Sequence, residues 1–513
     1  MVDVPPDRSS LPSLSPEERR TVLYASALGT EFDFRVLREA TGKPEEDLAE
    51  ELERLVHQGV LRERPPPGRY RFARERVRAG LYADLTESRA RVIHTNIARA
   101  LERLYPRGPP PELLGEFGRH AFLAKLHEAS LRYNREAGRQ ARRLFALEDA
   151  AHHYERARRD LQALPVPRGE EEGQLLLEMG EVYVALGEEI RADRLFVEAL
   201  ERTPVSARTL RAYLLLARAE VTRGAGPPER FPELCREALS LFEAEGDRPG
   251  LARAHRLLGQ HASARGDHQT ALAEGERAVG LLDPAKDRRE YARASVDLGN
   301  ALALRPSGVG TREAIVCFRR ALGILEELQD FPELARACNN IGVTLGGQDP
   351  ALGLSYLALA REYADRSKDR RMRGWALFNG VEFQLKLSRL PEALRDNEEA
   401  RVLLEPYGDR LVQRQLDLNR GMLALRQGHF PDAERAFRDA LRQAEQLGDP
   451  YGRSEAHLRI AQCLILSGRP GEARHELAQA EQIQGERWGN LGPAYHAVRS
   501  ILSPADRAGT GRS

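Results

Sequence analysis

Five asparagines stand out in the second half of this 513-residue sequence because of their spacing. Asn339, Asn379 and Asn419 lie forty residues apart, Asn340 follows Asn339, and Asn300 precedes them by nearly the same interval. A side-chain amide offers an acceptor and two donors, so it can hold the C=O and N–H of a peptide group whatever side chain the peptide carries. Two interpretations follow: these amides bind a peptide, or they cap and brace neighbouring helices.

Arginines accompany the amides, since Arg336 and Arg420 lie in the same segments as Asn340 and Asn419. A guanidinium group binds carboxylates through paired, charge-assisted hydrogen bonds. Such groups would favour an acidic partner or a C-terminal carboxylate. Chance explains most of their placement, however, because all but five of the 78 basic residues are arginines.

No catalytic pattern accompanies these residues. The sequence has no HExxH, no GxSxG and no EF-hand loop. Its one Gly–Lys pair, Gly42–Lys43, is followed by Pro44 and lacks the glycine-rich turn that a phosphate-binding loop needs. The cysteines lack the spacing of a metal site, and they are Cys235, Cys317, Cys338 and Cys463. We therefore expect no enzymatic activity, no cofactor and no metal.

The elements that carry the asparagines are predicted to be pairs of helices in a repeat of about 40 residues. In the clearest copy, Gly180 and Ala192 are small because the two helices cross there, and Tyr183 and Phe196 fill the space on either side. These are the positions of the tetratricopeptide repeat. The pattern predicts eight units over residues 173–484, and the later ones have their small residues at Ala217 and Ala238, Gly259 and Ala271, Gly299 and Ala314, Gly342 and Ala351, Gly380 and Ala393, Gly421 and Ala433, and Ala461 and Ala473.

Residues 15–105 follow a different pattern. Ser15 and Pro16, with two glutamates after them, begin a first helix. Two more helices are predicted up to Val56, and a turn at residues 65–68 then separates two short strands. Three helices followed by a two-stranded wing predict a winged-helix domain.

The charge of this domain bears on DNA binding. Its third helix, residues 43–56, has six acidic residues against two basic ones, whereas a helix that enters a DNA groove needs arginine or lysine toward the phosphates. The wing is basic, and Arg64, Arg69 and Arg71 are candidate contacts to a phosphate backbone. The acidic helix argues against nucleic acid as the partner.

The segment from Gly59 through the wing and on to Tyr105 resembles the part that follows the nucleotide-binding module in STAND-type signal-transduction ATPases. The resemblance implies a winged helix followed by a tetratricopeptide-like superhelix that senses a signal or binds a partner. The residues that would perform ATP hydrolysis are missing, so that activity cannot be transferred. In tetratricopeptide arrays the first helix of each pair lines a concave groove, and the asparagines resemble those of kinesin light chains and bacterial peptide receptors, which hold a peptide backbone.

The formal net charge is zero, so a bulk attraction to nucleic acid or acidic membranes is not indicated. No apolar run is long enough to span a membrane, and we expect a cytoplasmic protein. The remaining segments are a disordered N-terminus (1–14), atypical helical hairpins (106–165), and a C-terminal cap helix with a frayed tail (485–513).

The sequence therefore predicts an all-α fold, a right-handed tetratricopeptide-like α-solenoid preceded by a small winged-helix domain. Its expected function is that of a non-catalytic regulatory adaptor in cytoplasmic signalling, with a protein or peptide in the concave groove and a separate NTPase, kinase or cyclase as a possible partner. The alternative is a transcriptional regulator whose wing contacts DNA and whose superhelix senses a ligand.

Overall fold

The computed structural model describes residues 14–222, 230–305, 308–407, 410–484 and 491–502. The chain divides into two compact units, residues 1–245 and 246–513. In the first unit the elements are α1 (Pro16–Leu28), β1 (Glu31–Asp33), α2 (Phe34–Thr41), α3 (Glu45–His57), β2 (Leu61–Arg64), β3 (Arg69–Phe72), α4 (Glu75–Ala83), α5 (Glu87–Leu104), the 3-10 turn η2 (Pro111–Leu113), α6 (Leu114–Leu123), α7 (His127–Arg143), α8 (Leu147–Gln162), α9 (Gly169–Ala185), α10 (Glu189–Arg202), α11 (Arg208–Thr222) and α12 (Arg230–Glu245).

The second unit is helical throughout its described residues. Its elements are α13 (Arg248–Ala264), α14 (His268–Leu281), α15 (Arg288–Ala303), α16 (Gly308–Glu327), α17 (Phe331–Gly346), α18 (Pro350–Arg366), α19 (Arg370–Lys386), α20 (Leu390–Leu404), the 3-10 turn η3 (Glu405–Tyr407), α21 (Arg410–Arg426), α22 (Phe430–Gln446), α23 (Pro450–Leu466), α24 (Pro470–Gln484) and α25 (Gly492–Leu502).

Helices α1 to α3 and strands β2 and β3 lie where the sequence predicts three helices and a wing. A strand that was not predicted, β1, completes a three-stranded antiparallel sheet in the order β1-β3-β2. Phe32 of β1 stacks on Tyr70 of β3, and Leu37, Leu48 and Leu52 are fully buried beneath the sheet and helices. The same apolar cluster also includes residues of α6 and α7, so the core of this segment continues past Tyr105.

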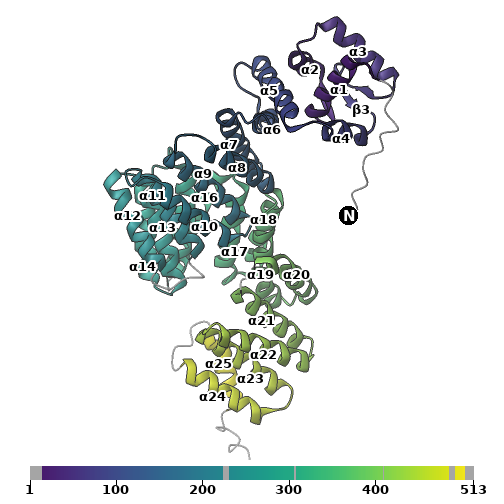
Figure 1. Cartoon of the computed structure of the whole chain (residues 1–513). Coiled ribbons are helices and arrows are strands. Elements are labelled where there is room, and N and C mark those ends of the chain that lie inside the picture. Colours follow the sequence, from purple (N-terminus) through teal and green to yellow (C-terminus); the bar gives the residue numbers. More distant parts are fainter. Residues whose placement is uncertain (1–13, 223–229, 306–307, 408–409, 485–490, 503–513) are drawn as a thin grey trace, which may run out of the picture. The chain divides into compact units, whose positions relative to one another are not determined.

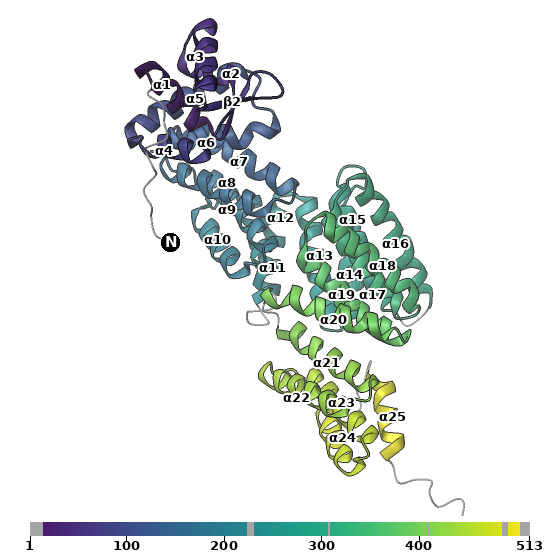
Figure 2. The same cartoon turned by 90° about the vertical axis from the view of Figure 1, so that its right-hand side faces the viewer.

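From α9 to α24 the described helices form eight successive pairs, and within each unit every pair packs on the next (Figure 1, Figure 2). The predicted all-α solenoid is therefore confirmed. Aspartates explain where many first helices begin: Asp247, Asp330 and Asp449 each accept a backbone N–H at the N-terminus of their helix, and each is followed within two residues by proline. Both features favour helix initiation.

Small residues permit close crossings inside the pairs, as predicted for Gly180 and Gly421. A Cβ added to Gly180 would lie 2.2 Å from Cε1 of Phe196, and one added to Gly421 would lie 2.4 Å from Cε1 of Phe437. The assignment of Ala351 is wrong, because this residue is exposed and Gly353 instead approaches Gly342 and Gly346 of α17. The assignment of Gly380 to this role is wrong, because a Cβ there would meet only Leu354 and Leu357 of the preceding pair at 3.5 Å and more. Val381, forty residues before Gly421, instead packs in this pair against Ala393.

Helix α25 packs on α23 and α24, and its buried side chains Tyr495, Val498 and Leu502 join the apolar cluster of that last pair. This helix covers the end of the stack, as a terminal cap must. Residues 1–13 and 503–513, which belong to the predicted disordered N-terminus and frayed tail, lie outside the described residues.

Candidate partner-binding face

The first helices of the pairs in the second unit contact one another in sequence, α13 with α15, α15 with α17, α17 with α19, α19 with α21, and α21 with α23. They therefore form one continuous face. All five predicted asparagines lie on these first helices. Among them, Asn340 and Asn419 occupy equivalent positions, two residues before the crossing glycines Gly342 and Gly421.

Asn379 occupies the same position on α19, because Val381 and not Gly380 lies at the crossing. It donates from Nδ2 to Oδ1 of Asn339 at 2.9 Å, which joins α19 to α17. Asn339 is buried and also donates to Oδ1 of Asn340 at 3.4 Å. The structure thus brings three of the predicted amides together. Among the described contacts, no acceptor is bound to the Nδ2 group of Asn340, and no donor is bound to Oδ1 of Asn379.

The other two asparagines do not join this group. Asn300 accepts a hydrogen bond from the hydroxyl of Thr344 at 3.4 Å, which links α15 to α17. Asn419 makes no amide contact to Asn379 in the described part of the chain. Asn300, Asn339 and Asn379 thus brace neighbouring helices. Asn300, Asn340, Asn379 and Asn419 are all partly exposed, and the peptide-binding interpretation stays a prediction.

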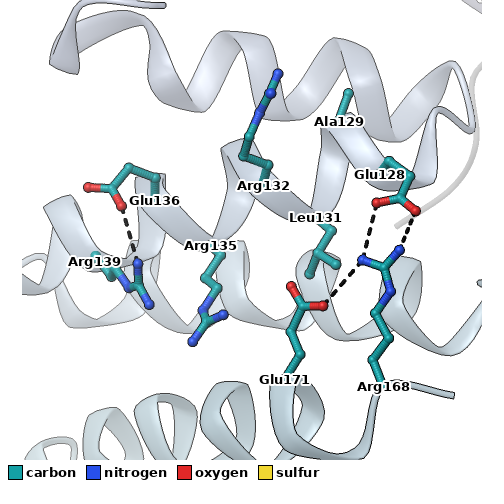
Figure 3. A pocket seen from close by; sticks show the side chains of 9 residues that line it. All are labelled: Glu128, Ala129, Leu131, Arg132, Arg135, Glu136, Arg139, Arg168 and Glu171. Atoms are coloured by element: carbon teal, nitrogen blue, oxygen red, sulfur yellow. Dashed lines mark hydrogen bonds and ion pairs between the residues drawn. The ribbon is translucent and has the colours of Figure 1, made fainter.

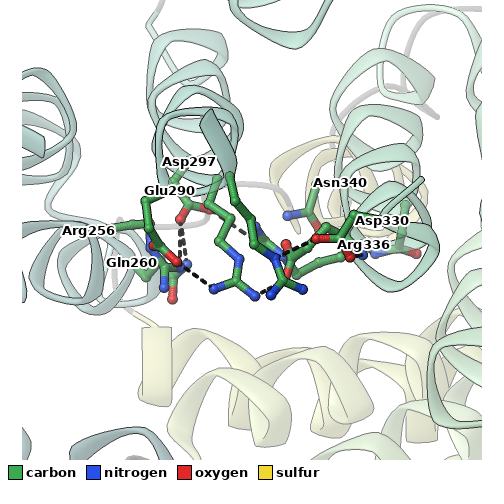
Figure 4. Close-up of polar contacts among 11 residues, drawn as sticks. Arg256, Gln260, Glu290, Asp297, Asp330, Arg336 and Asn340 are labelled. Carbon is green, nitrogen blue, oxygen red and sulfur yellow. Dashed lines mark hydrogen bonds and ion pairs between the residues drawn. The ribbon is translucent and has the colours of Figure 1, made fainter. Parts of the chain in front are cut away.

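Next to the amides, an ion-pair network connects three first helices (Figure 4). Asp297 of α15 accepts from Arg256 of α13 at 3.1 Å, from Gln260 of α13 at 2.7 Å and from Arg336 of α17 at 3.4 Å. The carboxylate and the Arg256 side chain are nearly buried, at 9% and 7% exposure. Each of these three contacts joins two neighbouring first helices and spans about one repeat, so the network fixes how successive helices stack.

The network continues through Glu333 of α17. This carboxylate accepts from Arg293 of α15 at 2.5 Å and from Arg336 of its own helix at 2.9 Å, while Glu290 accepts from Arg293 at 2.8 Å. Burial alone would raise the pKa of Glu333, but the guanidinium groups of Arg336 and Arg293 outweigh it and hold that pKa well below its usual value. These groups are therefore ionised and paired with one another, and they link α15 to α17.

The predicted site member Arg420 lies elsewhere. It pairs with Asp417 of its own helix at 3.0 Å and with Asp439 of the second helix α22 at 3.3 Å. Among the described contacts, Arg336 and Arg420 share no partner. Of the two, only Arg336 shares a surface with an amide of the group, since Asn340 is four residues further along the same helix.

The wing arginines belong to the first unit. Arg64 and Arg69 are exposed and directly opposite each other, and Arg71 is half-buried opposite Arg62. On its other side, β3 is paired with β1, where Asp33 faces Arg69 and Glu31 faces Arg71. The unpredicted strand thus offsets part of the wing's positive charge. The acidic residues of α3 are exposed apart from Glu51, which pairs with Lys43.

A cavity of about 600 Å³ lies over α7 and the start of α9 (Figure 3). Its arginines are already matched by carboxylates: Arg168 contacts Glu128 and Glu171, and Arg135 and Arg139 both donate to Glu178, at 2.8 and 2.7 Å. Sequence reasoning missed this site, although basic residues on α7 and acidic residues about one repeat later were a visible signal. Its charges are balanced, so it gives no preference for an anion.

The described residues contain neither a candidate metal site nor a candidate membrane span. No group of three or more His, Cys, Asp or Glu side chains there could hold a metal ion. None of the described helices combines the length and apolar character needed to cross a bilayer. Three of the cysteines are buried, and the fourth, Cys317, is half-buried.

A family model described as tetratricopeptide repeat matches residues 418–489, and the search of curated proteins gives no match. Among solved structures, the chain is similar to a STAND protein with a tetratricopeptide repeat sensor from Pyrococcus horikoshii, with 11% identity, TM-score 0.46 and coverage of 96% of this chain and 66% of that one. This chain thus spans just under two thirds of that protein.

Two further solved structures are similar over most of their own length. A Rap protein complexed with competence and sporulation factor has 14% identity and TM-score 0.47, and the match covers 77% of this chain and 99% of that one. The Rap conjugation gene regulator of plasmid pLS20, in complex with the Phr* peptide, has 11% identity and TM-score 0.49, with 77% and 97% covered.

Proposed function

We propose that this protein is a non-catalytic scaffold and acts as a regulatory adaptor in cytoplasmic signalling. It binds an extended segment of a protein partner along the face formed by the first helices of its second unit. The observation that carries the proposal is the repetition of a partly exposed amide at one position of three neighbouring helices, at Asn340, Asn379 and Asn419. A row of amides on neighbouring helices, about 8–10 Å apart, can hold peptide groups about three residues apart along an extended chain.

The neighbouring ion pairs support the same proposal. Asp297 and Glu333 hold α13, α15 and α17 in fixed positions, so Asn340 is presented from a rigid element and the partner does not have to order it on binding. Pre-organisation of this kind raises affinity by reducing the entropy lost in the complex. The segment from α1 to β3 acts in this proposal as a winged-helix packing module, on which a separate NTPase, kinase or cyclase docks.

The test is affinity purification of the tagged full chain from its native cytosol, with and without nuclease, followed by mass spectrometry. We expect one protein partner in both samples, and its retention should fall about tenfold or more in the double variant Asn340→Ala/Asn379→Ala, because two hydrogen bonds worth about 1 kcal/mol each are lost. Gln427→Ala, an exposed amide in the turn after α21, is the matched control and should retain the partner.

Circular dichroism establishes that both variants are folded before the comparison is made. The proposal fails if the double variant retains the partner as well as the wild type does. It also fails if nuclease removes the retained material, which would support the DNA-binding alternative instead.

A further inference from the structure

Two histidines of the first unit are fully buried and in direct contact. His94 of α5 and His120 of α6 have 0% exposure, and their Nδ1 atoms lie 2.8 Å apart. The Nε2 atom of His94 is 2.9 Å from the hydroxyl of Tyr82 on α4. The Nε2 atom of His120 is 2.9 Å from Nη2 of Arg119. Neither histidine was singled out by its sequence pattern.

The contacts fix both tautomers. A guanidinium group can only donate, so Arg119 donates to Nε2 of His120, and His120 must carry its proton on Nδ1. That proton is donated to Nδ1 of His94, which must then carry its own proton on Nε2 and donate it to the oxygen of Tyr82. The four residues form one directed chain of hydrogen bonds that is fully satisfied only when both imidazoles are neutral.

The chain ties together four helices. Arg119 also donates to the backbone carbonyl of Leu28 at 2.7 Å, and Arg78 of α4 donates to that of Ser26 at 3.2 Å. Both carbonyls belong to the last turn of α1, where cations are favoured. Thus α1, α4 and α5, which belong to the N-terminal segment, are joined through this cluster to α6, the first helix of the following hairpins.

We propose that the Arg119–His120–His94–Tyr82 hydrogen-bond chain makes the packing of α5 against α6 sensitive to acid. Protonation of one imidazole then releases the N-terminal segment from α6. An added proton on Nδ1 of His94 would point at the N–H of His120, and one on Nε2 of His120 would point at Arg119. Either event leaves two buried donors facing each other without an acceptor, and this cost destabilises the packing of α5 against α6.

The charged surroundings reinforce this sensitivity. Burial and the positive charge of Arg119 lower the pKa of His94 to about 4; burial, Arg119 and His94 hold the pKa of His120 well below its usual value. The charged groups that act on Arg119 are Glu116 on α6 and Arg78 on α4. Arg156 on α8 is influenced by Arg119, and Asp33 on β1 acts on Glu116. Arg91 on α5 donates to the carbonyl of Ala124. Of the carboxyl groups, Glu116 is 4.0 Å from His120, and burial raises its pKa, which weakens it as a counter-ion.

Hydrogen exchange of the full chain tests the proposal. After correction for intrinsic rates, protection of the amides in α5 and α6 should fall about tenfold or more between pH 6.5 and pH 4.5, while α2 and α3 keep theirs. The variant His94→Asn/His120→Asn, which has no group to titrate here, should lose that step, and His57→Gln, at an exposed histidine of α3, should keep it. A pH-independent α5 and α6, or a simultaneous loss of protection in α2 and α3, overturns the proposal.

Nitrogen-15 NMR of the histidine rings in the wild-type chain gives a second measurement that does not depend on how the variants fold. We expect the ring proton of His120 on Nδ1 and that of His94 on Nε2, with both rings neutral at pH 6. The opposite tautomers, or titration of either ring near pH 6.5, would contradict the hydrogen-bond chain and with it the proposal.

Discussion

Replacing Gly421 by alanine should destabilise the second unit, whereas the same replacement at Gly380 on the preceding first helix should stabilise it. At Gly421 the new Cβ would lie 2.4 Å from Cε1 and 2.5 Å from Cδ1 of Phe437, and that ring is completely buried, so it cannot move away. At Gly380 the nearest atom is Cδ2 of Leu354 at 3.5 Å, an ordinary van der Waals contact.

Two opposing effects set the magnitudes. Alanine is favoured over glycine inside a helix by about 1 kcal/mol, and both positions benefit. Forcing an extra carbon into a packed core costs about 1–3 kcal/mol, and only Gly421 incurs that cost. We therefore expect Gly421→Ala to lower the free energy of unfolding by about 1 kcal/mol and Gly380→Ala to raise it by about 0.5–1 kcal/mol.

Urea denaturation of both full-length variants, followed by far-UV circular dichroism, measures the difference as a change in midpoint at constant slope. Changes of the same sign in the two variants would refute the assigned crossing. A reversed order, with Gly380→Ala the less stable, would restore the crossing that the repeat pattern alone predicts. Equal stability of Gly421→Ala and wild type would show that Phe437 can move despite its burial.

Three further results are expected. Ser388 has a positive φ of 58° in the turn after α19, and Gly428 has a φ of 78° forty residues later. Because glycine adopts such a backbone without strain, Ser388→Gly should raise the free energy of unfolding and Gly428→Ala should lower it, each by about 1 kcal/mol. Thermal denaturation measures both changes. Asp297→Ala removes the carboxylate that Arg256 contacts in a nearly buried pair, and urea titration should show a loss of about 3 kcal/mol. For His94, the pKa is about 4 in the folded chain against about 6.5 unfolded, so stability is full above pH 6.5 and should fall by about 3 kcal/mol as the pH drops to 4, measured by denaturation across that range.

The helical pairs could be predicted from the sequence because the requirement for a crossing is local. A small residue such as Gly180 and the large Phe196 that covers it lie within one pair, and their spacing repeats. The register of a single pair is less well determined, as Gly380 shows: a glycine next to the true crossing position satisfies the pattern as well as Val381 does. Only packing against Ala393 distinguishes the two.

Contacts between neighbouring helical pairs were harder to predict, although the sequence contains part of the evidence for them. Asp297 lies 41 residues after Arg256 and 39 before Arg336, so opposite charges at one-repeat spacing could have indicated the ion-pair network. The His94–His120 contact has no such signal, because α5 and α6 belong to no repeat and their crossing depends on how the N-terminal segment packs. Strand β1 was missed for a related reason: three residues are too few to show an alternating pattern.

The adjacency of Asn339 and Asn340 explains why one helix can both brace the face and present a binding group. Consecutive residues of an α-helix point about 100° apart, so Asn339 turns into the interface with α19 while Asn340 remains on the surface. Asn379 completes the arrangement, since its Nδ2 holds Asn339 and its Oδ1 stays available. A partner that binds Asn340 and Asn379 would therefore span two helices whose spacing is already fixed by the buried amide, and replacing Asn339 alone should weaken binding indirectly, by loosening that spacing, even though Asn339 does not reach the partner.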